Sequence, residues 1–288
     1  MDQNIINLFD EYTHKPLRRD EFLRRLAQLT GSVAAAMTVL PLLESNYANA
    51  ATVPVHVEGI SAEDITYPGD NTTMKGYLVK PDNIKAGEKR GAVIVIHENR
   101  GLNPHIRDVT RRVAQAGYIA LAPDALSVAG GTPSNEDEAR ALFGKLDAKQ
   151  NLNNFLKGFD YLKSLPESNG KTAAVGFCWG GALTNQLAVN DPTLDAAVAF
   201  YGMQAAAADV PKIKARVLLH YGEKDERVNA GIPAYEEALK AAGTKYELFV
   251  YEGAQHAFHN DTSGPRYNKE AAEKAWARTL QLFKETIA

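Results

Sequence analysis

The chain has 288 residues, of which 45% are apolar and 23% are charged, and its formal net charge is −3 at neutral pH. This globular composition, with both signs of charge interspersed, excludes the basic footprint of a nucleic-acid-binding protein and the polybasic patch of a membrane-surface protein. The single cysteine, Cys178, excludes an intrachain disulfide framework and a zinc site built mainly on thiolates.

The first fifty residues have the pattern of an export signal. A basic stretch containing Arg18 and Arg19 precedes the uncharged, Ala-rich segment 26–43, and Ala48 and Ala50 form a small-x-small exit. The stretch resembles a twin-arginine signal, with two residues rather than one between the arginine pair and the following Phe-Leu. Thr, Gly and Ser inside the apolar segment argue against a stable transmembrane span.

This pattern predicts two regions, a removable signal over 1–50 and a globular domain over 51–288. The localisation that follows is periplasmic or exported. The alternative is an amphipathic N-terminal arm that stays on a cytoplasmic protein.

Beyond residue 54, apolar runs alternate with helical patterns. Segment 63–82 predicts an antiparallel hairpin around the turn-rich GDNTT. Strands are then expected within 91–101, 118–126, 171–177, 194–202, 215–222 and 245–253. Helices are expected over 106–117, over 136–167 as one or two, over 180–189, over 232–243, and at the C-terminus with an apolar stripe of Trp276, Leu280, Phe283 and Ile287.

Strands that are apolar on both faces and separated by helices require a mostly parallel sheet with helices on both faces. The expected fold is therefore a single α/β domain whose sheet carries an antiparallel N-terminal edge. No repeat and no linker interrupts the chain after residue 60.

Four polar residues follow strands at the edge where ligands bind in parallel sheets, namely Glu98, Cys178, Asp225 and His256. A thiol, a carboxylate and an imidazole are the three parts of an activated nucleophile. Their order along the chain, nucleophile, then acid, then histidine, is the order expected of α/β-hydrolases.

The glycines around Cys178 explain why the thiol lies there. A strand that turns sharply into a helix needs small neighbours, which Gly176 and Gly180 provide. The helix N-terminus favours the thiolate, which is the reactive form of the thiol. The backbone N–H groups of Trp179 and Asn99 are the candidate oxyanion donors.

Residues from about 60 to 288 resemble the dienelactone hydrolase family of α/β-hydrolases. The stretches that carry the resemblance are VIVIHENRGL, VGFCWGGAL, HYGEKDERV and EGAQHAFHND. The resemblance implies hydrolysis of enol lactones and related esters, with Cys178 as nucleophile, His256 as general base and acid, and Asp225 as the residue that orients it.

The same resemblance implies that Glu98 contacts the cysteine when the site is empty and helps to deprotonate it. It also implies that arginines bind a substrate carboxylate. One of these positions carries Asn260 in this chain, and Arg140 is the candidate for another.

The prediction is a hydrolase of small-molecule esters or lactones that acts through an acyl-enzyme. Tyr201 and Phe258 are expected to line its pocket. No cofactor is implied, and no metal site is expected, because the paired histidines lack ligand spacing. The protein is expected to be a monomer or a dimer. A thioesterase, a general carboxylesterase and a non-catalytic redox sensor using Cys178 stay open as alternatives.

Overall fold

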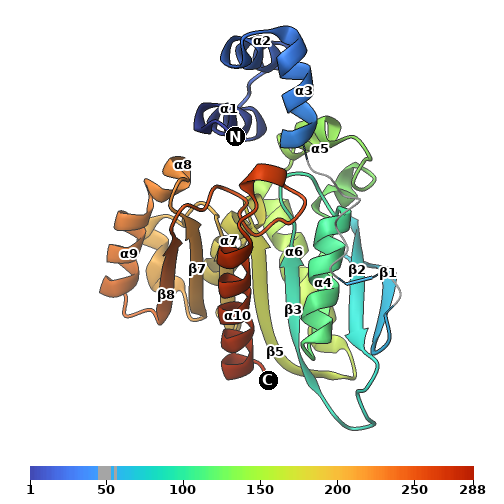
Figure 1. The fold of residues 1–288 in the computed structure, drawn as a ribbon. Helices are drawn as coiled ribbons and strands as arrows, with labels where there is room; N and C mark the ends of the chain where they lie inside the picture. Colours follow the sequence, from blue (N-terminus) through green and yellow to red (C-terminus); the bar gives the residue numbers. More distant parts are fainter. Residues whose placement is uncertain (45–52, 55–56) are drawn as a thin grey trace.

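An eight-stranded mixed sheet forms the centre of the computed structural model, which describes residues 1–44, 53–54 and 57–288 (Figure 1). The strand order is β1-β2-β4-β3-β5-β6-β7-β8. The strands are β1 (Ile60–Pro68), β2 (Thr73–Pro81), β3 (Arg90–Ile96), β4 (Ile119–Pro123), β5 (Ser168–Phe177), β6 (Ala196–Phe200), β7 (Arg216–Gly222) and β8 (Tyr246–Tyr251).

The predicted hairpin and the predicted mixed sheet are both confirmed. β1 pairs antiparallel with β2, so that Ile60 lies opposite Pro81 and Pro68 opposite Thr73. β2 also runs antiparallel to β4, whereas all pairings from β4 to β8 are parallel. The carboxyl ends of six strands therefore meet at one edge, where the chain places its polar residues.

Helices cover both faces of the sheet. They are α4 (Pro104–Gln115), α5 (Glu136–Phe143), α6 (Ala148–Ser164), α7 (Trp179–Asn190), α8 (Glu226–Asn229), α9 (Ile232–Ala241) and α10 (Lys269–Thr286). Short 3₁₀ turns lie at η2 (Ala125–Ala129), η3 (Ala207–Lys212) and η4 (Gly264–Arg266). The expected helix over 136–167 is thus two helices, which are separated after Phe143 by a Gly-containing turn.

Strand alternation decides which helices pack on which face. On β3, Val93 and Val95 belong to the core under α4 and α10, whereas Ile94 and Ile96 belong to the core under α6, α7 and α9. Successive side chains of a strand point to opposite faces, so a continuously apolar strand feeds two cores at once.

The N-terminal residues form a separate helical unit above the carboxyl edge of the sheet (Figure 1). It consists of α1 (Gln3–His14), α2 (Arg19–Thr30) and α3 (Val33–Leu43), and it has its own small core that includes Phe9, Phe22, Leu26 and Leu40. The proposed cleavage pattern at Ala48 and Ala50 lies outside the described residues.

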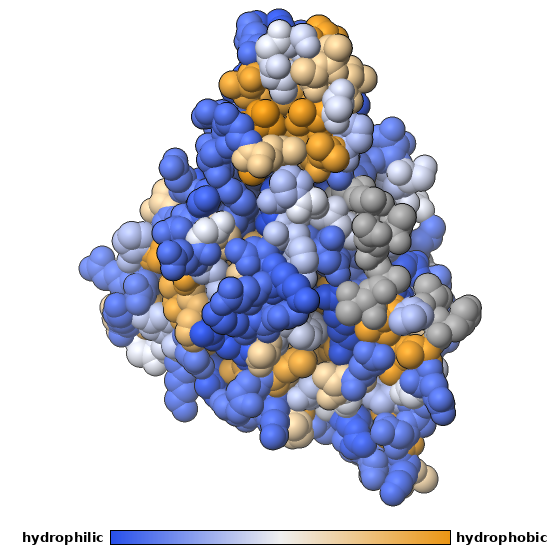
Figure 2. Space-filling model, in the orientation of Figure 1, coloured by the Kyte–Doolittle hydropathy of each residue, from blue (hydrophilic) through white to orange (hydrophobic). Residues whose placement is uncertain are grey.

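Apolar side chains gather on the outer surface of this N-terminal unit (Figure 2). Leu29, Val33, Met37 and Leu42 are each 47–69% exposed. No single helix among the described residues is long and apolar enough to cross a membrane, and α2 and α3 would meet that requirement only as a pair bent by 110°.

Candidate active site

Cys178 stands at a strained turn between β5 and α7, as the sequence predicts. Its φ of 56° lies in the left-handed region, which a non-glycine residue adopts at a cost. A Cβ on Gly176 would lie 2.0 Å from the carbonyl oxygen of Gly180, and a Cβ on Gly180 would lie 2.4 Å from that of Ile96. Only glycines allow strand and helix to approach this closely, and this approach lifts the thiol clear of the sheet.

Asp225 and His256 form the second part of the site. The Nδ1–H of His256 donates to Oδ2 of Asp225 at 2.5 Å, and both side chains are at most 5% exposed. The other carboxylate oxygen of Asp225 accepts from the backbone N–H of Val228 and so caps α8. Asp225 therefore combines a helix cap with the orientation of a histidine, which fixes the ring in one tautomer.

The structure brings Cys178 and His256 together. Sγ of Cys178 and a ring nitrogen of His256 lie within 4.8 Å of one another. Nε2 of His256 is buried and has no hydrogen-bond partner among the described residues. An unoccupied nitrogen beside a nucleophile suits a general base, since such contacts are often long in empty sites and tighten when substrate binds.

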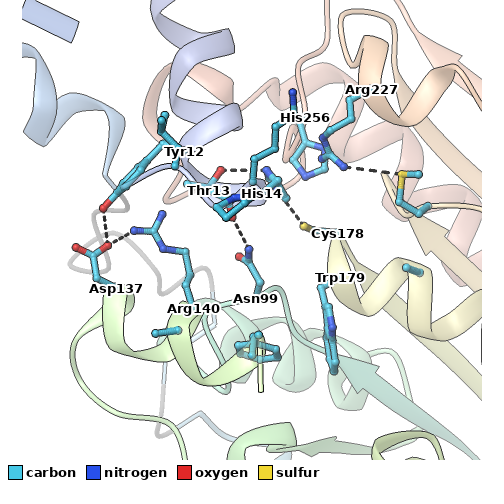
Figure 3. A pocket seen from close by; sticks show the side chains of 18 of the residues that line it. Tyr12, Thr13, His14, Asn99, Asp137, Arg140, Cys178, Trp179, Arg227 and His256 are labelled. Carbon is cyan, nitrogen blue, oxygen red and sulfur yellow. Dashed lines mark hydrogen bonds and ion pairs between the residues drawn. The ribbon is translucent and has the colours of Figure 1, made fainter. Parts of the chain in front are cut away.

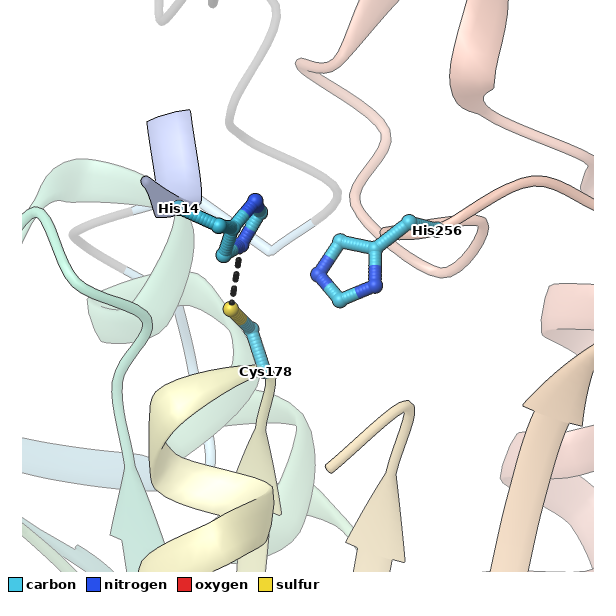
Figure 4. A group of neighbouring side chains, drawn as sticks. All are labelled: His14, Cys178 and His256. Carbon is cyan, nitrogen blue, oxygen red and sulfur yellow. Dashed lines mark hydrogen bonds between the residues drawn. The ribbon is translucent and has the colours of Figure 1, made fainter. Parts of the chain in front are cut away.

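A second histidine, which the sequence analysis did not identify, also contacts the nucleophile. Nε2 of His14, the last residue of α1, lies 3.1 Å from Sγ of Cys178. The rings of His14 and His256 meet edge to face, with centroids 4.6 Å apart (Figure 4). The available signal was the amphipathic spacing of Ile5, Phe9 and Tyr12, which predicts a helix but does not indicate where that helix docks.

The charges around the thiol favour its ionised form. Burial alone raises the pKa of the Cys178 thiol, but His14 and His256 outweigh burial and lower the pKa to about 6. Burial lowers the pKa of His256, whereas Asp225, Asp10 and Cys178 raise it well above its ordinary value. A thiolate between imidazolium groups is the state in which a cysteine nucleophile reacts.

The two residues that carry the candidate oxyanion donors, Trp179 and Asn99, line the same cavity as Cys178. Trp179 is the first residue of α7, a position whose backbone N–H has no acceptor within the helix. Its indole stacks on His97, with ring centroids 5.5 Å apart. Asn99 follows β3 and donates its side-chain Nδ2 to the backbone carbonyl of Thr13 (Figure 3).

Glu98 is buried, but its hydrogen bond goes elsewhere than the resemblance implies. Oε2 of Glu98 accepts from Nδ2 of Asn260 at 2.8 Å, and Oε1 has no hydrogen-bond partner among the described residues. The contact that the resemblance assigns to Glu98 is made by His14. Burial raises the pKa of Glu98, but His105, Arg100 and Arg266 lower it below its ordinary value, so the carboxylate is charged.

A cavity of about 790 Å³ opens beside the thiol, and both the α/β domain and the N-terminal unit line it (Figure 3). Arg140 of α5 lines the cavity, pairs with Asp137 and lies over the ring of Tyr12 at 4.2 Å. Tyr201 also lines it, with its ring centroid 5.1 Å from that of His256.

The expectation that Phe258 lines the pocket is wrong. Phe258 is fully buried and packs against Tyr201 and Tyr251 in the core under α10. The residue therefore supports Tyr201 from below and is not part of the cavity wall.

Within the described part of the chain, His14, Cys178 and His256 also have the ligand types and spacing of a small metal site. Thiolate and imidazole are ligands that zinc prefers. A metal ion here would occupy the sulfur lone pairs that a nucleophile needs, so metal binding and nucleophilic attack by Cys178 would exclude one another.

Most of the chain is similar in sequence to known proteins. The model of the family described as "Dienelactone hydrolase family" matches residues 74–287, so the N-terminal helical unit lies outside the matched region. A protein of Saccharolobus solfataricus named "Putative carboxymethylenebutenolidase" is 34% identical, over 77% of this chain and 98% of its own length. A protein of the same name from Escherichia coli K12 is 33% identical, over 79% of this chain and 88% of its own length.

A solved structure with the same family name is similar in fold. The crystal structure titled as that of a "Putative Dienelactone Hydrolase" from Klebsiella pneumoniae superposes with a TM-score of 0.69 at 31% identity. The match covers 78% of this chain and 98% of the other. The sheet, the helices on both faces and the antiparallel edge are thus those of the α/β-hydrolase fold.

Proposed function

Because this chain belongs to the dienelactone hydrolase family, we propose that it hydrolyses ester or lactone bonds of small molecules through a covalent acyl-enzyme on Cys178. The observation that carries the proposal is the Asp225–His256 bond of 2.5 Å beside a thiol on a strained strand-to-helix turn. These side chains come from three different parts of the chain, and their burial together beside a cavity supports a functional role.

The reaction begins with attack of the Cys178 thiolate on the carbonyl carbon, which forms a C–S bond and places the carbonyl electron pair on oxygen. The N–H groups of Trp179 and Asn99 stabilise this oxyanion. When the oxyanion collapses, the C–O bond to the leaving group breaks and His256 donates a proton to the departing oxygen. A thioester on Cys178 remains.

The second half-reaction regenerates the enzyme. His256, now neutral, takes a proton from water as the water oxygen attacks the thioester carbonyl. Collapse of the second tetrahedral intermediate releases the carboxylic acid and returns the thiolate. Asp225 holds the ring in the required orientation in both halves, because its carboxylate accepts from Nδ1 throughout.

The test of this mechanism uses p-nitrophenyl acetate and the Cys178→Ala variant. The native protein is expected to release a burst of p-nitrophenol and to gain the mass of one acetyl group on Cys178. The variant is expected to show neither the burst nor the added mass, and to hydrolyse p-nitrophenyl acetate at least about 10³-fold more slowly than the native protein. Full activity in Cys178→Ala, with unchanged circular dichroism, would refute the mechanism.

The substrate class is resolved by a panel of enol lactones, activated esters and thioesters, compared by kcat/KM. We propose a preference for lactones and oxygen esters over thioesters, in keeping with the name of the family. A redox sensor would instead form a sulfenic acid on Cys178 with hydrogen peroxide and show no turnover of any member of the panel.

A further inference from the structure

The end of α1 reaches the nucleophile from outside the matched family region, and this contact has the form of a second histidine–carboxylate pair. Nε2 of His14 lies 3.1 Å from Sγ of Cys178, while Nδ1 of the same ring lies 3.0 Å from Oδ1 of Asp10, one helical turn earlier. On the other side of the sulfur, His256 is paired with Asp225 through a direct hydrogen bond, whereas Nδ1 of His14 makes its hydrogen bond to the Asp10 carbonyl and an ion-pair contact with the carboxylate.

We propose that His14 is a second catalytic histidine, which donates a hydrogen bond to Sγ of Cys178 in the resting enzyme and thereby prepares it for acylation. The proposal rests on the cysteine mechanism proposed above. It makes the first fourteen residues part of the active site and assigns the two imidazoles different tasks.

The surroundings of the His14 ring fix its role. Nδ1 faces three oxygens, namely the backbone carbonyl of Asp10 at 2.9 Å, the Asp10 carboxylate at 3.0 Å and the Thr13 hydroxyl at 3.0 Å. The carbonyl and the carboxylate only accept hydrogen bonds, and the Thr13 hydroxyl donates its own hydrogen to the carbonyls of Phe9 and Asp10. Nδ1 therefore carries a proton, and a nearby carboxylate favours a second proton on Nε2. A doubly protonated ring can only donate to the sulfur, which is then the thiolate.

Asp10 is itself held in place from the catalytic domain. Its Oδ2 lies 3.3 Å from Nε of Arg227, the second residue of α8, whose N-cap is Asp225. The side chain of Asp10 is 16% exposed and that of His14 is 12% exposed. The pair is therefore a largely desolvated ion pair fixed to the domain that carries the triad, and its interaction is stronger than that of a surface pair.

His256 is left free for proton transfer. Its Nε2 has no hydrogen-bond partner in the described ranges, whereas Nε2 of His14 is engaged with the sulfur. A histidine that must protonate a leaving group and later deprotonate water needs a free nitrogen beside the substrate. A histidine that stabilises a thiolate needs permanent contact with it.

The N-terminal unit forms a wall of the cavity and leaves the cavity open. Tyr12 donates its hydroxyl to Asp137 at 2.9 Å, Thr13 accepts from Asn99 at 2.8 Å, and Gln3 exchanges side-chain hydrogen bonds with Gln255. These contacts join α1 and the residues at its end to three separate places on the domain, and a cavity of about 790 Å³ that both parts line remains beside the thiol (Figure 3). Substrate can therefore enter with His14 in place.

Further titratable and charged groups surround the thiol and its histidines. Tyr201 interacts with the thiol itself, Asp10, Glu98 and Asp225 interact with His256, and Arg140 and Arg227 line the same cavity. Among the described side chains, His14 forms the hydrogen bond to the sulfur, whereas Nε2 of His256 has no hydrogen-bond partner. Removal of His14 is therefore expected to change the thiolate more than the removal of any of these six.

The experiment compares His14→Gln and His256→Gln in the full chain, with EDTA present to exclude metal effects. Burst kinetics with p-nitrophenyl acetate separate acylation from deacylation, and iodoacetamide rates against pH report the thiolate. His14→Gln is expected to slow acylation at neutral pH about tenfold, to move the alkylation midpoint up by about one pH unit, and to change deacylation less than about twofold. His256→Gln is expected to slow both steps.

Two further variants keep the result interpretable. Asn4→Ala, at an exposed position on α1, is the control for changes in that helix and should behave as the native chain. His14→Ala opens space beside the sulfur, and added imidazole is expected to restore acylation in this variant and not in Asn4→Ala. Unchanged acylation and alkylation in His14→Gln would overturn the proposal, as would faster acylation, which would mean that α1 obstructs the site.

Failure of the proposed function gives a different result. In that case the native chain shows no burst and Cys178→Ala keeps its activity. If only the role of His14 is wrong, the native burst and its loss in Cys178→Ala both remain.

Discussion

Nδ1 of His256 donates to Oδ2 of Asp225 across 2.5 Å, in a site where neither side chain is more than 5% exposed. The same Asp225 caps α8 through its other oxygen. One carboxylate thus links the local structure of a short helix to the orientation of the proposed general base, and substitutions can separate the two roles.

Asp225→Asn is expected to keep the cap and lose the catalytic role. Asparagine is as good a helix N-cap as aspartate, so the melting temperature should change little. The amide cannot hold the imidazole in the same tautomer or stabilise its charge, so kcat/KM for p-nitrophenyl acetate should fall about 10³- to 10⁴-fold. Asp225→Ala should lose the same activity and about 1 kcal/mol of stability as well. Substantial esterase activity in Asp225→Asn would exclude this role.

Alkylation of Cys178 is expected to follow a low titration midpoint. Burial raises the pKa of the thiol, but the two histidines outweigh burial and lower the pKa to about 6, so the thiol is protonated and slow below that pH and ionised above it. The rate of inactivation by iodoacetamide should therefore rise through about pH 6, whereas a free thiol rises near pH 8.5. A midpoint above about pH 8 would show that the thiolate is not stabilised.

Gly180→Ala is expected to destabilise the fold through the turn at Cys178. The added Cβ would lie 2.4 Å from the carbonyl oxygen of Ile96 and 2.6 Å from that of His97, and neither backbone atom can move without moving β3. The expected cost is about 3 kcal/mol, measured by thermal or urea unfolding. Gly144→Ala is the matched control, since its Cβ would meet only the Ala141 carbonyl at 3.6 Å. Equal stability of the two variants would contradict this account of the turn.

Arg140 is expected to contribute to the binding of anionic substrates. Its guanidinium lines the cavity beside Tyr12, where it can pair with a carboxylate on the substrate. Arg140→Gln should raise KM for a carboxylate-bearing ester about tenfold and leave KM for p-nitrophenyl acetate, which has no carboxylate, nearly unchanged. An equal effect on both substrates would assign Arg140 a structural role.

The active protein is expected to keep its first fourteen residues. The export prediction from the sequence stays a prediction, and cleavage before Ala51 would remove His14 from the site. Intact mass spectrometry of periplasmic and cytoplasmic fractions, each assayed for esterase activity, measures both points together. An active fraction whose mass begins at Ala51 would support export and remove His14 from the mechanism.

Most of the fold was predictable because its signals are local. The continuous apolar runs of β3 and β5 indicate strands buried on both faces, and the glycines at 176 and 180 indicate the tight turn that holds Cys178. The sequence did not decide whether 136–167 forms one helix or two. Its helical pattern runs through the whole segment, and the turn after Phe143 leaves only a weak signal.

Parts of the candidate site were predictable for the same reason and others were not. Strand-end placement identified Cys178, Asp225 and His256, since the carboxyl ends of parallel strands share one edge. The depth of Phe258 depends on how α10 packs above it, and the partner of Glu98 depends on a loop 162 residues away, at Asn260. Neither contact leaves a trace in the local sequence.

The sequence alone determined an α/β domain with a thiol, an acid and an imidazole at one edge of its sheet, because strand periodicity and turn glycines act within a few residues. The tertiary structure decided that His14, 164 residues away from the thiol along the chain, contacts it, and that Asp10, one helical turn before His14, supports this contact. Contacts between elements so distant in the chain arise from docking of whole surfaces, and no pattern within one helix records which surface it will meet.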